Sequence, residues 1–255
     1  CCSSYLKPSM SSLQKGLYLL TIFARVPYKF TVSQLEEMTG FNRTTIYRIL
    51  STLEKSGMLI KDSQSKIYKM GPLAYHLGNI YLSNANYKDS ILRILEEISK
   101  ESAESVGIAH RVGNKVVSLF EVETYQMVKI NDQPGTFYPM NRGCYGKCLM
   151  AYHDPLVVEK LLEETTFEKV APNALTDKEA ILQEYARIRE QGYVESIDEV
   201  AAYICAVGVP LRNPDQRVEN VVAISFFRQD DYLEKIARMK AILFKYQTEL
   251  EKYIV

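Results

Sequence analysis

The chain has 255 residues, 47% of them hydrophobic and 24% charged, and its 31 Lys and Arg balance 31 Asp and Glu. This composition is typical of a folded globular protein and excludes a disordered one, and the length suits two domains. No apolar stretch approaches the roughly 18 residues that span a bilayer. The N-terminal residues lack the apolar segment of a secretory signal. We therefore expect a cytoplasmic protein with no membrane partner.

The net charge of zero hides an asymmetry along the chain. Residues 1–87 contain ten Lys and Arg against four Asp and Glu, which gives this part a charge of +6 and leaves −6 for the rest. A basic segment joined to an acidic one indicates different partners at the two ends. A polyanion is the natural partner of the basic part, although charge alone does not distinguish nucleic acid from lipid or an acidic protein.

The first 56 residues contain three helical patterns. Residues 11–26 form the first, whose apolar stripe comprises Leu13, Leu17, Leu20, Phe23 and Ala24. A second, shorter helix follows a capping residue at Thr31 or Ser33 and stops at Gly40. Asn42 suits the N-cap of the third helix, which runs to Ser56 before Gly57. The second and third patterns are separated by only a tight turn.

Residues 58–70 contain two strand-like runs around a polar turn at 62–65, which predicts a β-hairpin. The predicted order is therefore helix, helix, tight turn, helix, hairpin, and this is the order of a winged helix-turn-helix. In such a domain the second helix of the turn motif enters the DNA major groove with its N-terminal residues at the base edges. We assign residues 1–70 to this DNA-binding domain.

The third helix divides into an apolar stripe (Ile46, Ile49, Leu50 and Leu53) and a face of hydroxyls and cations. An ordinary exposed face would alternate acids with bases, whereas this one offers donors suited to phosphates and base edges. Its candidate DNA-binding residues are Arg43, Thr44, Thr45, Tyr47, Arg48, Ser51 and Lys55. Lys61, Lys66 and Lys69 of the hairpin would contact the phosphate backbone of the operator.

Residues 71–87 suit a linker helix, and residues 88–255 form the predicted second domain. That domain is expected to open with a helix at 88–103, followed by strands at 105–111, 115–122 and 126–131. Helices near 144–152 and 155–164 precede a long helix that begins with a capping box at 176–179 and ends at Gly192. Strands at 204–212 and 218–227 and a helix at 231–253 complete the order. Strands that arrive in runs predict an α+β fold with a mainly antiparallel sheet.

Several segments in this order resemble the IclR-type bacterial transcription regulators. They are TVSQLEEMTGFNRTTIYRILSTLEKSGML, YKMGPLAYHLG, GKCLMAY (146–152), LQEYARIREQGY (182–193), DEVAAYICAVGVPL (198–211) and VVAISFF (221–227). The resemblance implies a winged helix and linker helix joined to a GAF-like domain that binds a small effector, commonly a carboxylate. It also implies homodimers or tetramers on palindromic DNA operators. The family usually has glycine where Tyr203 stands.

Family effectors lie against the sheet, near the Gly-Lys motif and the two late strands. Carried over by position, the effector-binding residues would be Cys144, Tyr145, Ser196, Ala206, Ser225 and Phe227. The glycine turn before Gly146-Lys147 precedes a helix, and backbone N–H groups there suit a carboxylate oxygen. The acidic pair Asp198-Glu199 is interpreted as a hydrogen-bonded turn that shapes the pocket.

Other functions have weaker support in the sequence. Cys144, Cys148 and Cys205 would permit a thiol- or metal-responsive sensor, although their pattern fits small buried hydrophobic residues better. A winged helix that binds another protein is a further alternative. The sequence contains no G-x-S-x-G, H-E-x-x-H or G-x-G-x-x-G motif, so we expect neither an enzyme nor a cofactor or metal site.

Overall fold

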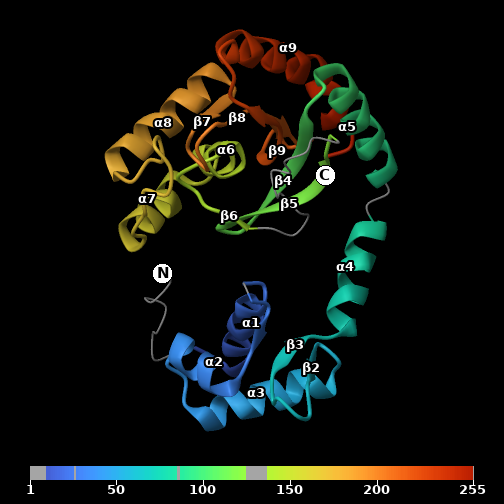
Figure 1. Ribbon diagram of the computed structural model, residues 1–255, viewed down its shortest axis with the longest axis vertical. Helices are drawn as coiled ribbons and strands as arrows, with labels where there is room; N and C mark the ends of the chain where they lie inside the picture. Colours follow the sequence, from blue (N-terminus) through green and yellow to red (C-terminus); the bar gives the residue numbers. More distant parts are fainter. Residues whose placement is uncertain (1–9, 26, 85–86, 125–136, 255) are drawn as a thin grey trace. The chain divides into compact units, whose positions relative to one another are not determined.

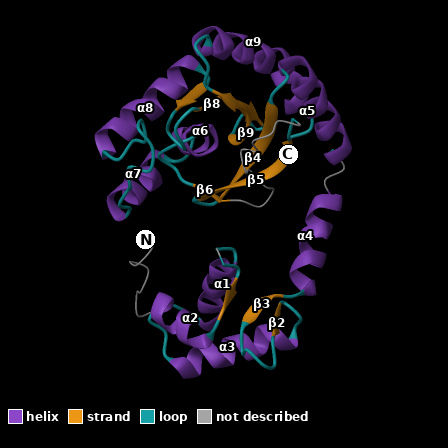
Figure 2. Ribbon diagram, in the orientation of Figure 1, coloured by secondary structure: helices purple, strands orange, loops and turns teal. Residues whose placement is uncertain are grey.

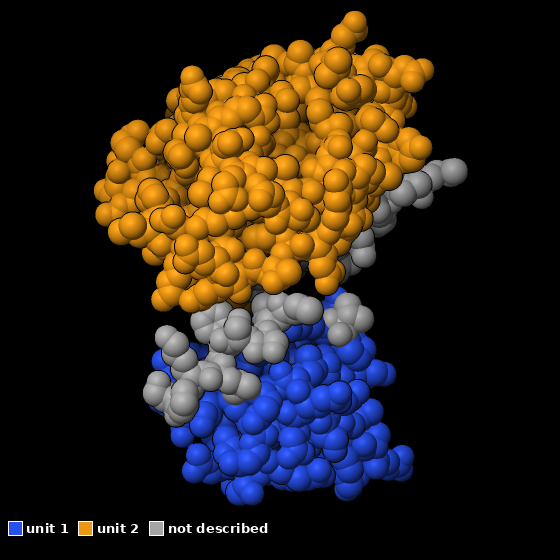
Figure 3. All heavy atoms as spheres, turned by 90° about the vertical axis from the view of Figure 1, so that its left-hand side faces the viewer, with its two compact units in different colours: residues 1–86 blue, residues 87–255 orange. Residues whose placement is uncertain are grey.

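The computed structural model describes residues 10–25, 27–84, 87–124 and 137–254. These residues form two compact units, 1–86 and 87–255, coloured separately in Figure 3. Each unit has its own sheet and its own buried core. We describe each unit by itself.

The first unit is a three-helix domain with a small sheet and a final helix (Figure 1). Its elements are α1 (Ser12–Phe23), β1 (Lys29–Phe30), α2 (Val32–Thr39), α3 (Arg43–Lys55), β2 (Leu59–Lys61), β3 (Tyr68–Met70) and α4 (Pro72–Asn84). The strands pair antiparallel in the order β1-β3-β2. The predicted winged helix is confirmed, and the short strand β1 is an addition that the sequence analysis missed.

Local side-chain chemistry fixes the boundaries of α2 and α3. Thr31 and Gln34 form a capping box at the start of α2, and Gly40 ends it with a φ of 67°. The Asn42 side chain then accepts a hydrogen bond from the Thr45 N–H at 2.8 Å and caps α3. The turn between these helices therefore follows from residues that are all visible in the sequence.

The core of this unit corrects the stripe predicted for the first helix. Leu19, Ile22 and Phe23 are the buried residues of α1, whereas Leu13 is 72% and Leu17 56% exposed. Apolar residues occur around most of this helix, so periodicity alone did not select the packed side. On α3 the prediction is confirmed for Ile46, Ile49 and Leu50, which are buried, and Leu53 packs partly buried against them.

In the described part of the second unit, helices lie on both faces of an antiparallel sheet of six strands (Figure 2). Its elements are α5 (Lys88–Ser102), β4 (Ser105–Val112), β5 (Lys115–Val122), β6 (Phe137–Tyr138), α6 (Cys144–Ala151), α7 (Pro155–Glu164), α8 (Lys178–Gln191), β7 (Val194–Ile197), β8 (Ile204–Arg212), β9 (Val218–Phe227) and α9 (Tyr232–Glu251). The strand order is β6-β5-β4-β9-β8-β7. Together with the first unit this confirms the predicted α+β class.

Strand alternation assigns residues to the two faces of this sheet. Ala109, Ala223 and Val194 pack with α6, and we call this side the α6 face. Their neighbours in sequence point to the opposite face, where the Lys235 ammonium of α9 lies 4.8 Å from the centre of the Phe226 ring. The helices α5 and α9 cover that second face (Figure 1).

Some details of the second unit differ from the sequence-based expectations. Strands β6 and β7 were not predicted, because two and four residues carry too little pattern. The N-cap of α8 is Asp177, whose side chain accepts from the Ala180 N–H at 2.9 Å, and not Thr176. The strand predicted at 126–131 lies outside the described residues.

Close packing at one glycine sets the position of α6. A Cβ on Gly146 would overlap the carbonyl oxygen of Pro139 and approach the Cα of Met140 within 3.2 Å. Real Cβ atoms do not make such contacts, so only glycine fits here. Gly146 thus allows α6 to pack directly against the backbone at Pro139 and Met140. Lys147 is the next residue of α6.

Candidate functional site

The hydroxyl and cation face of α3 lies at the surface of the first unit. Arg43, Thr44, Tyr47, Arg48, Ser51 and Lys55 are exposed, and Thr45, whose N–H donates to the Asn42 cap, is half-buried. The burial of Ile46, Ile49 and Leu50 on the other side fixes this orientation. The helix therefore presents its polar residues outward from a rigid core.

Among the described residues of this unit, two arginines on this face make only long polar contacts. Arg43 lies 3.6 Å from a carboxylate oxygen of Glu36, and its guanidinium is 5.7 Å from the centre of the Tyr47 ring. Arg48 donates to the Ser12 hydroxyl at 3.4 Å. Contacts of this kind between exposed groups contribute little and exchange readily for a stronger anion. Both guanidinium groups can thus turn to a phosphate or a base.

The hairpin that follows α3 carries three lysines around a rigid turn. Asp62 holds the turn by accepting from the backbone N–H groups of Gln64 and Ser65, at 3.0 and 2.7 Å. Lys66 and Lys69 are exposed, whereas Lys61 is half-buried with its ammonium 5.2 Å from the centre of the Tyr68 ring. The hairpin is thus a cationic strand pair, with one of its lysines stacked on an aromatic ring.

In the second unit, three of the residues assigned to the effector lie next to one another on the sheet. Ser196 of β7 pairs with Ala206 of β8, and Ala206 pairs with Ser225 of β9. Ser225 in turn pairs with Ser105 of β4. We call these four residues the small-residue row; alternation places them on the α6 face, where Ser196 is buried and the others are half-buried. Phe227 follows Ser225 on the same face and is also half-buried.

The other two assigned residues begin α6, and both are buried. The Cys144 thiol lies 3.7 Å from the carbonyl oxygen of Val194, and the Tyr145 hydroxyl donates to Glu121 at 3.2 Å. The Tyr145 ring packs edge-on against Tyr138, with 4.8 Å between their centres. The six assigned residues therefore share one face of the sheet and the start of the helix above it.

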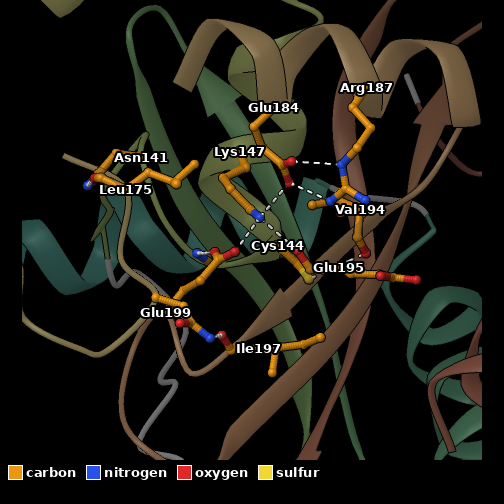
Figure 4. Close-up of polar contacts among 12 residues, drawn as sticks. Asn141, Cys144, Lys147, Leu175, Glu184, Arg187, Val194, Glu195, Ile197 and Glu199 are labelled. Carbon is orange, nitrogen blue, oxygen red and sulfur yellow. Dashed lines mark hydrogen bonds and ion pairs between the residues drawn. The ribbon is translucent and has the colours of Figure 1, made fainter. Parts of the chain in front are cut away.

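A buried lysine joins this site to two distant segments (Figure 4). The Lys147 side chain is 1% exposed, and its ammonium donates to Glu184 of α8 at 2.8 Å and to Glu199 at 2.6 Å. A third donation reaches the carbonyl oxygen of Glu195 on β7 at 2.7 Å. Arg187 donates to both carboxylate oxygens of Glu184, so the four side chains together are neutral. We call these four residues the lysine network.

The pKa shifts in the lysine network follow from burial and pairing. Burial would lower the pKa of Lys147, but the charges of Glu199 and Glu184 outweigh burial and raise it. Burial raises the pKa of Glu199 despite the opposing charge of Lys147. Burial acts on Glu184 in the same direction, but the hydrogen bonds and charges of Arg187 and Lys147 lower its pKa. Lys147 is therefore held firmly as an ammonium.

The start of α6 is partly occupied by the protein itself. The second oxygen of Glu199 accepts from the backbone N–H of Gly143 at 3.0 Å. Glu199 therefore takes the Gly143 N–H, one of the backbone donors that were expected to serve an effector carboxylate. Asp198, the other member of the acidic pair, accepts from the Tyr203 N–H at 2.7 Å, so the predicted hydrogen-bonded turn is confirmed. Tyr203 has a φ of 65°, the conformation that favours glycine.

The sheet separates the cysteines that a thiol or metal sensor would need to combine. Cys144 and Cys148 pack on the α6 face, whereas Cys205 alternates with Ala206 and so points to the opposite face. Burial raises the pKa of each thiol, that of Cys205 to about 11, which disfavours the reactive thiolate. Among the described residues no group of His, Cys, Asp or Glu has the arrangement of a metal site. The three cysteines therefore do not meet at one site, and the described residues give no support to the thiol- or metal-responsive alternative.

Sequence reasoning missed Glu121 and the lysine network. Lys147 stands in the apolar helix CYGKCLMA, all of it buried, and a lysine there requires carboxylate partners. That signal was present, but its partners lie 37 and 52 residues away. Nothing in the sequence around Glu121 distinguishes it from an exposed strand residue.

Comparison with known proteins identifies the family. Residues 79–250 match the family model for the bacterial transcriptional regulator IclR C-terminal domain, and residues 12–63 match the IclR helix-turn-helix domain. The chain belongs to the IclR family. Within that family it is 26% identical over 213 residues to the HTH-type transcriptional regulator KipR of Bacillus subtilis, with 84% of each chain covered. It is 25% identical to the DNA-binding transcriptional repressor YiaJ of Escherichia coli, covering 84% of this chain and 77% of YiaJ.

Solved structures show the same fold. An IclR regulator from Alicyclobacillus acidocaldarius matches with a TM-score of 0.79 and 25% identity, over 96% of this chain and 99% of that one. An IclR homolog from Microbacterium hydrocarbonoxydans, solved in complex with 4-hydroxybenzoate, matches with a TM-score of 0.71 and 19% identity, over 95% and 100% of the two chains. This IclR-family chain is thus a DNA-binding transcriptional regulator with a C-terminal effector domain, and not an enzyme. None of its described helices is long and apolar enough to span a membrane.

Proposed function

We propose that this IclR-family regulator binds a palindromic operator as a homo-oligomer, and that a small carboxylate metabolite in the second unit modulates its affinity for DNA. The main support for the DNA-binding part of this proposal is the exposed face of α3. It presents Arg43, Arg48 and Lys55 together with three hydroxyl-bearing residues on a helix whose opposite side is buried. Such donors suit phosphates and base edges in a major groove.

The proposed homo-oligomer is supported by apolar residues at the surface of the first unit. Leu13 and Leu17 of α1 are exposed, and α4 exposes Tyr75, Leu77, Ile80 and Tyr81. Large apolar side chains exposed together along a helix suit burial in an interface between copies. A second copy that covers these helices also supplies a second α3, and one recognition helix alone reads too few base pairs for useful specificity.

The proposed effector site lies on the α6 face of the second unit. Its floor would be the small-residue row, whose short side chains include the hydroxyls of Ser105, Ser196 and Ser225. Cys144, Tyr145 and Phe227 would border it with one thiol and two aromatic rings. Hydroxyl groups donate to carboxylate oxygens, and an aromatic wall favours a flat or apolar ligand body. The 4-hydroxybenzoate in the Microbacterium homolog is a ligand of this kind.

Replacement of Arg48 tests the DNA-binding proposal. Arg48→Ala removes one cation and its hydrogen bonds from the α3 face, and since Arg48 is exposed and its hydrogen bond to the Ser12 hydroxyl is long, the fold should persist. We expect an operator affinity lower by roughly 10-fold or more in a gel shift, because one contact to a base or phosphate is worth about 1–3 kcal/mol. The matched control is Arg238→Ala, which removes an exposed arginine from α9. Equal affinities for the two variants would contradict the assignment of α3.

Salt dependence distinguishes DNA binding from the alternative of a protein-binding winged helix. Binding through phosphate contacts weakens steeply as salt is raised, because counterions are released from the DNA. An apolar protein interface changes little under the same conditions. A flat salt profile for the partner of the first unit would favour the protein-binding alternative.

A further inference from the structure

Glu121 places an acidic group on the same face of the sheet as the proposed effector site. It lies on β5 opposite Gly107 of β4, and Gly107 pairs with Ala223 of β9. Since Ala223 and Ser225 are two residues apart on one strand, Glu121 shares the α6 face with the small-residue row. Its side chain is half-buried.

Neighbouring residues hold the Glu121 carboxylate in one position. One of its oxygens accepts from the Ser118 hydroxyl at 2.7 Å and from the Tyr145 hydroxyl at 3.2 Å. The other oxygen lies over Gly107, where a Cβ would overlap both it and the Tyr145 hydroxyl. Glycine at 107 thus provides the space for the carboxylate, and Tyr145 connects it to the start of α6.

Because the Glu121 carboxylate lies over Gly107, the spacing from Gly107 to Ser225 approximates its distance from the small-residue row, and this spacing suits a small metabolite. Gly107 and Ser225 are separated by one strand spacing of about 4.8 Å and two residues of about 3.4 Å each, which gives about 8 Å between their Cα atoms. A ligand of about five to seven bonds that meets the small-residue row with one end therefore reaches Glu121 with the other.

The two ends of such a site differ in hydrogen-bonding character. The serine hydroxyls of the small-residue row can donate, whereas an ionised carboxylate can only accept. We propose that Glu121 recognises a hydrogen-bond donor on the effector, so that the effector is a hydroxy acid or amino acid and not a dicarboxylate. This inference rests on the proposed effector site and names the class of ligand that it takes.

The expected discrimination follows from the charge of Glu121. A hydrogen bond to a charged acceptor increases affinity by about 10- to 100-fold. A carboxylate at the same position is repelled by Glu121, because two like charges lie close together in a partly buried site. An acid with a plain methyl end makes neither interaction with Glu121. Its affinity should therefore lie between that of a donor-ended acid and that of a dicarboxylate.

Two matched ligand sets test this specificity with the full-length protein. The flexible set is pentanoate, 5-hydroxypentanoate, 5-aminopentanoate and glutarate, and the planar set is benzoate, 4-hydroxybenzoate, 4-(aminomethyl)benzoate and terephthalate. Binding is measured by calorimetric titration and by the shift in melting temperature. In at least one set we expect the donor-ended acids to bind the wild-type protein at least 10-fold more tightly than the dicarboxylate.

Glu121→Gln provides the second arm of the test. This change removes the charge at nearly constant shape, so the preference over the dicarboxylate should fall below about 3-fold. The control Glu219→Gln alters a carboxylate near the other end of β9, where it pairs with Arg111 at 3.3 Å, and should leave the ranking unchanged. The wild-type ranking tests the inference even if a variant folds poorly.

The possible failures are distinct. A dicarboxylate that binds the wild-type protein as tightly as the donor-ended acids, or a ranking unchanged by Glu121→Gln, overturns the role of Glu121 and leaves the effector site standing. If no compound of either set shifts the melting temperature or alters operator binding, both the effector site and the role of Glu121 are overturned.

Discussion

Replacing Lys147 by methionine should destabilise the second unit strongly, since methionine fills similar space but carries no charge. The change removes three donations, to Glu184, Glu199 and the Glu195 carbonyl. Hydrogen bonds to charged groups are worth about 1.5–3 kcal/mol each. Arg187 still pairs with Glu184, and Glu199 keeps the Gly143 N–H and can take up a proton. We therefore expect a loss of about 3–5 kcal/mol, the range for breaking a buried ion pair.

Urea unfolding followed by circular dichroism measures this loss as the fall in the midpoint of the second unit's transition. The matched control is Lys178→Met, which breaks ion pairs to Glu163 and Glu159 at 3.0 and 3.6 Å, both with exposed carboxylates. Its midpoint should change far less, because exposed pairs contribute little.

The pH dependence of the Lys147→Met protein distinguishes a lost charge from a lost packing contact. Without the ammonium, the pKa of Glu199 should lie still further above that of the unfolded chain. The folded state then binds the proton more tightly, so its stability should increase as the pH falls from 7 toward 5. Adding Glu199→Gln should recover at least about 1 kcal/mol and abolish this response. A loss below about 1 kcal/mol, with no effect of acid, would refute the reasoning.

Two further predictions follow from the same region. Gly146→Ala should lower the free energy of unfolding of the second unit by at least about 1–3 kcal/mol, because the added Cβ overlaps the Pro139 carbonyl oxygen. Urea unfolding measures this loss, and an unchanged midpoint would show that α6 and the Pro139 backbone are not in close contact. The pKa of Lys147 is higher in the folded protein than its ordinary value of 10.5, so the charged ammonium stabilises the wild-type fold in full below pH 10.5. This contribution is lost as the pH rises through the higher pKa of the folded state. The stability difference between wild type and Lys147→Met should therefore narrow above pH 10.5, and a constant difference between pH about 9 and 12 would argue against it.

The elements of the first unit could be predicted because their signals are local. Asn42, Gly40 and Thr31 each act within four residues of their own position, and the alternation of apolar and polar residues on α3 fixed its exposed face. The packed side of α1 could not be predicted in the same way. Its apolar residues surround the helix, and the choice of Leu19 over Leu17 depends on contacts with other segments.

In the second unit the limits of prediction have the same origin. The lengths of β8 and β9 were clear from their apolar runs, and family resemblance placed Ser196, Ala206 and Ser225 in one site. The separation of Cys205 from Cys144 and Cys148, in contrast, depends on which residues of β8 face α6. A shift of one residue along a strand exchanges the two faces, so sequence spacing alone did not settle it.

The burial of the three described cysteines makes the native protein suitable for kinetic labelling. Cys144 and Cys148 are buried residues of α6 itself and Cys205 lies on the opposite face of the sheet, all at most 4% exposed. A maleimide can therefore modify each thiol only after a transient opening of its own side of the sheet. With Cys1 and Cys2 replaced by serine, the labelling rate of Cys205 reports detachment of the α9 side, and that of Cys148 reports release of α6. Adding an effector during such an experiment would show which layer of the domain it rigidifies.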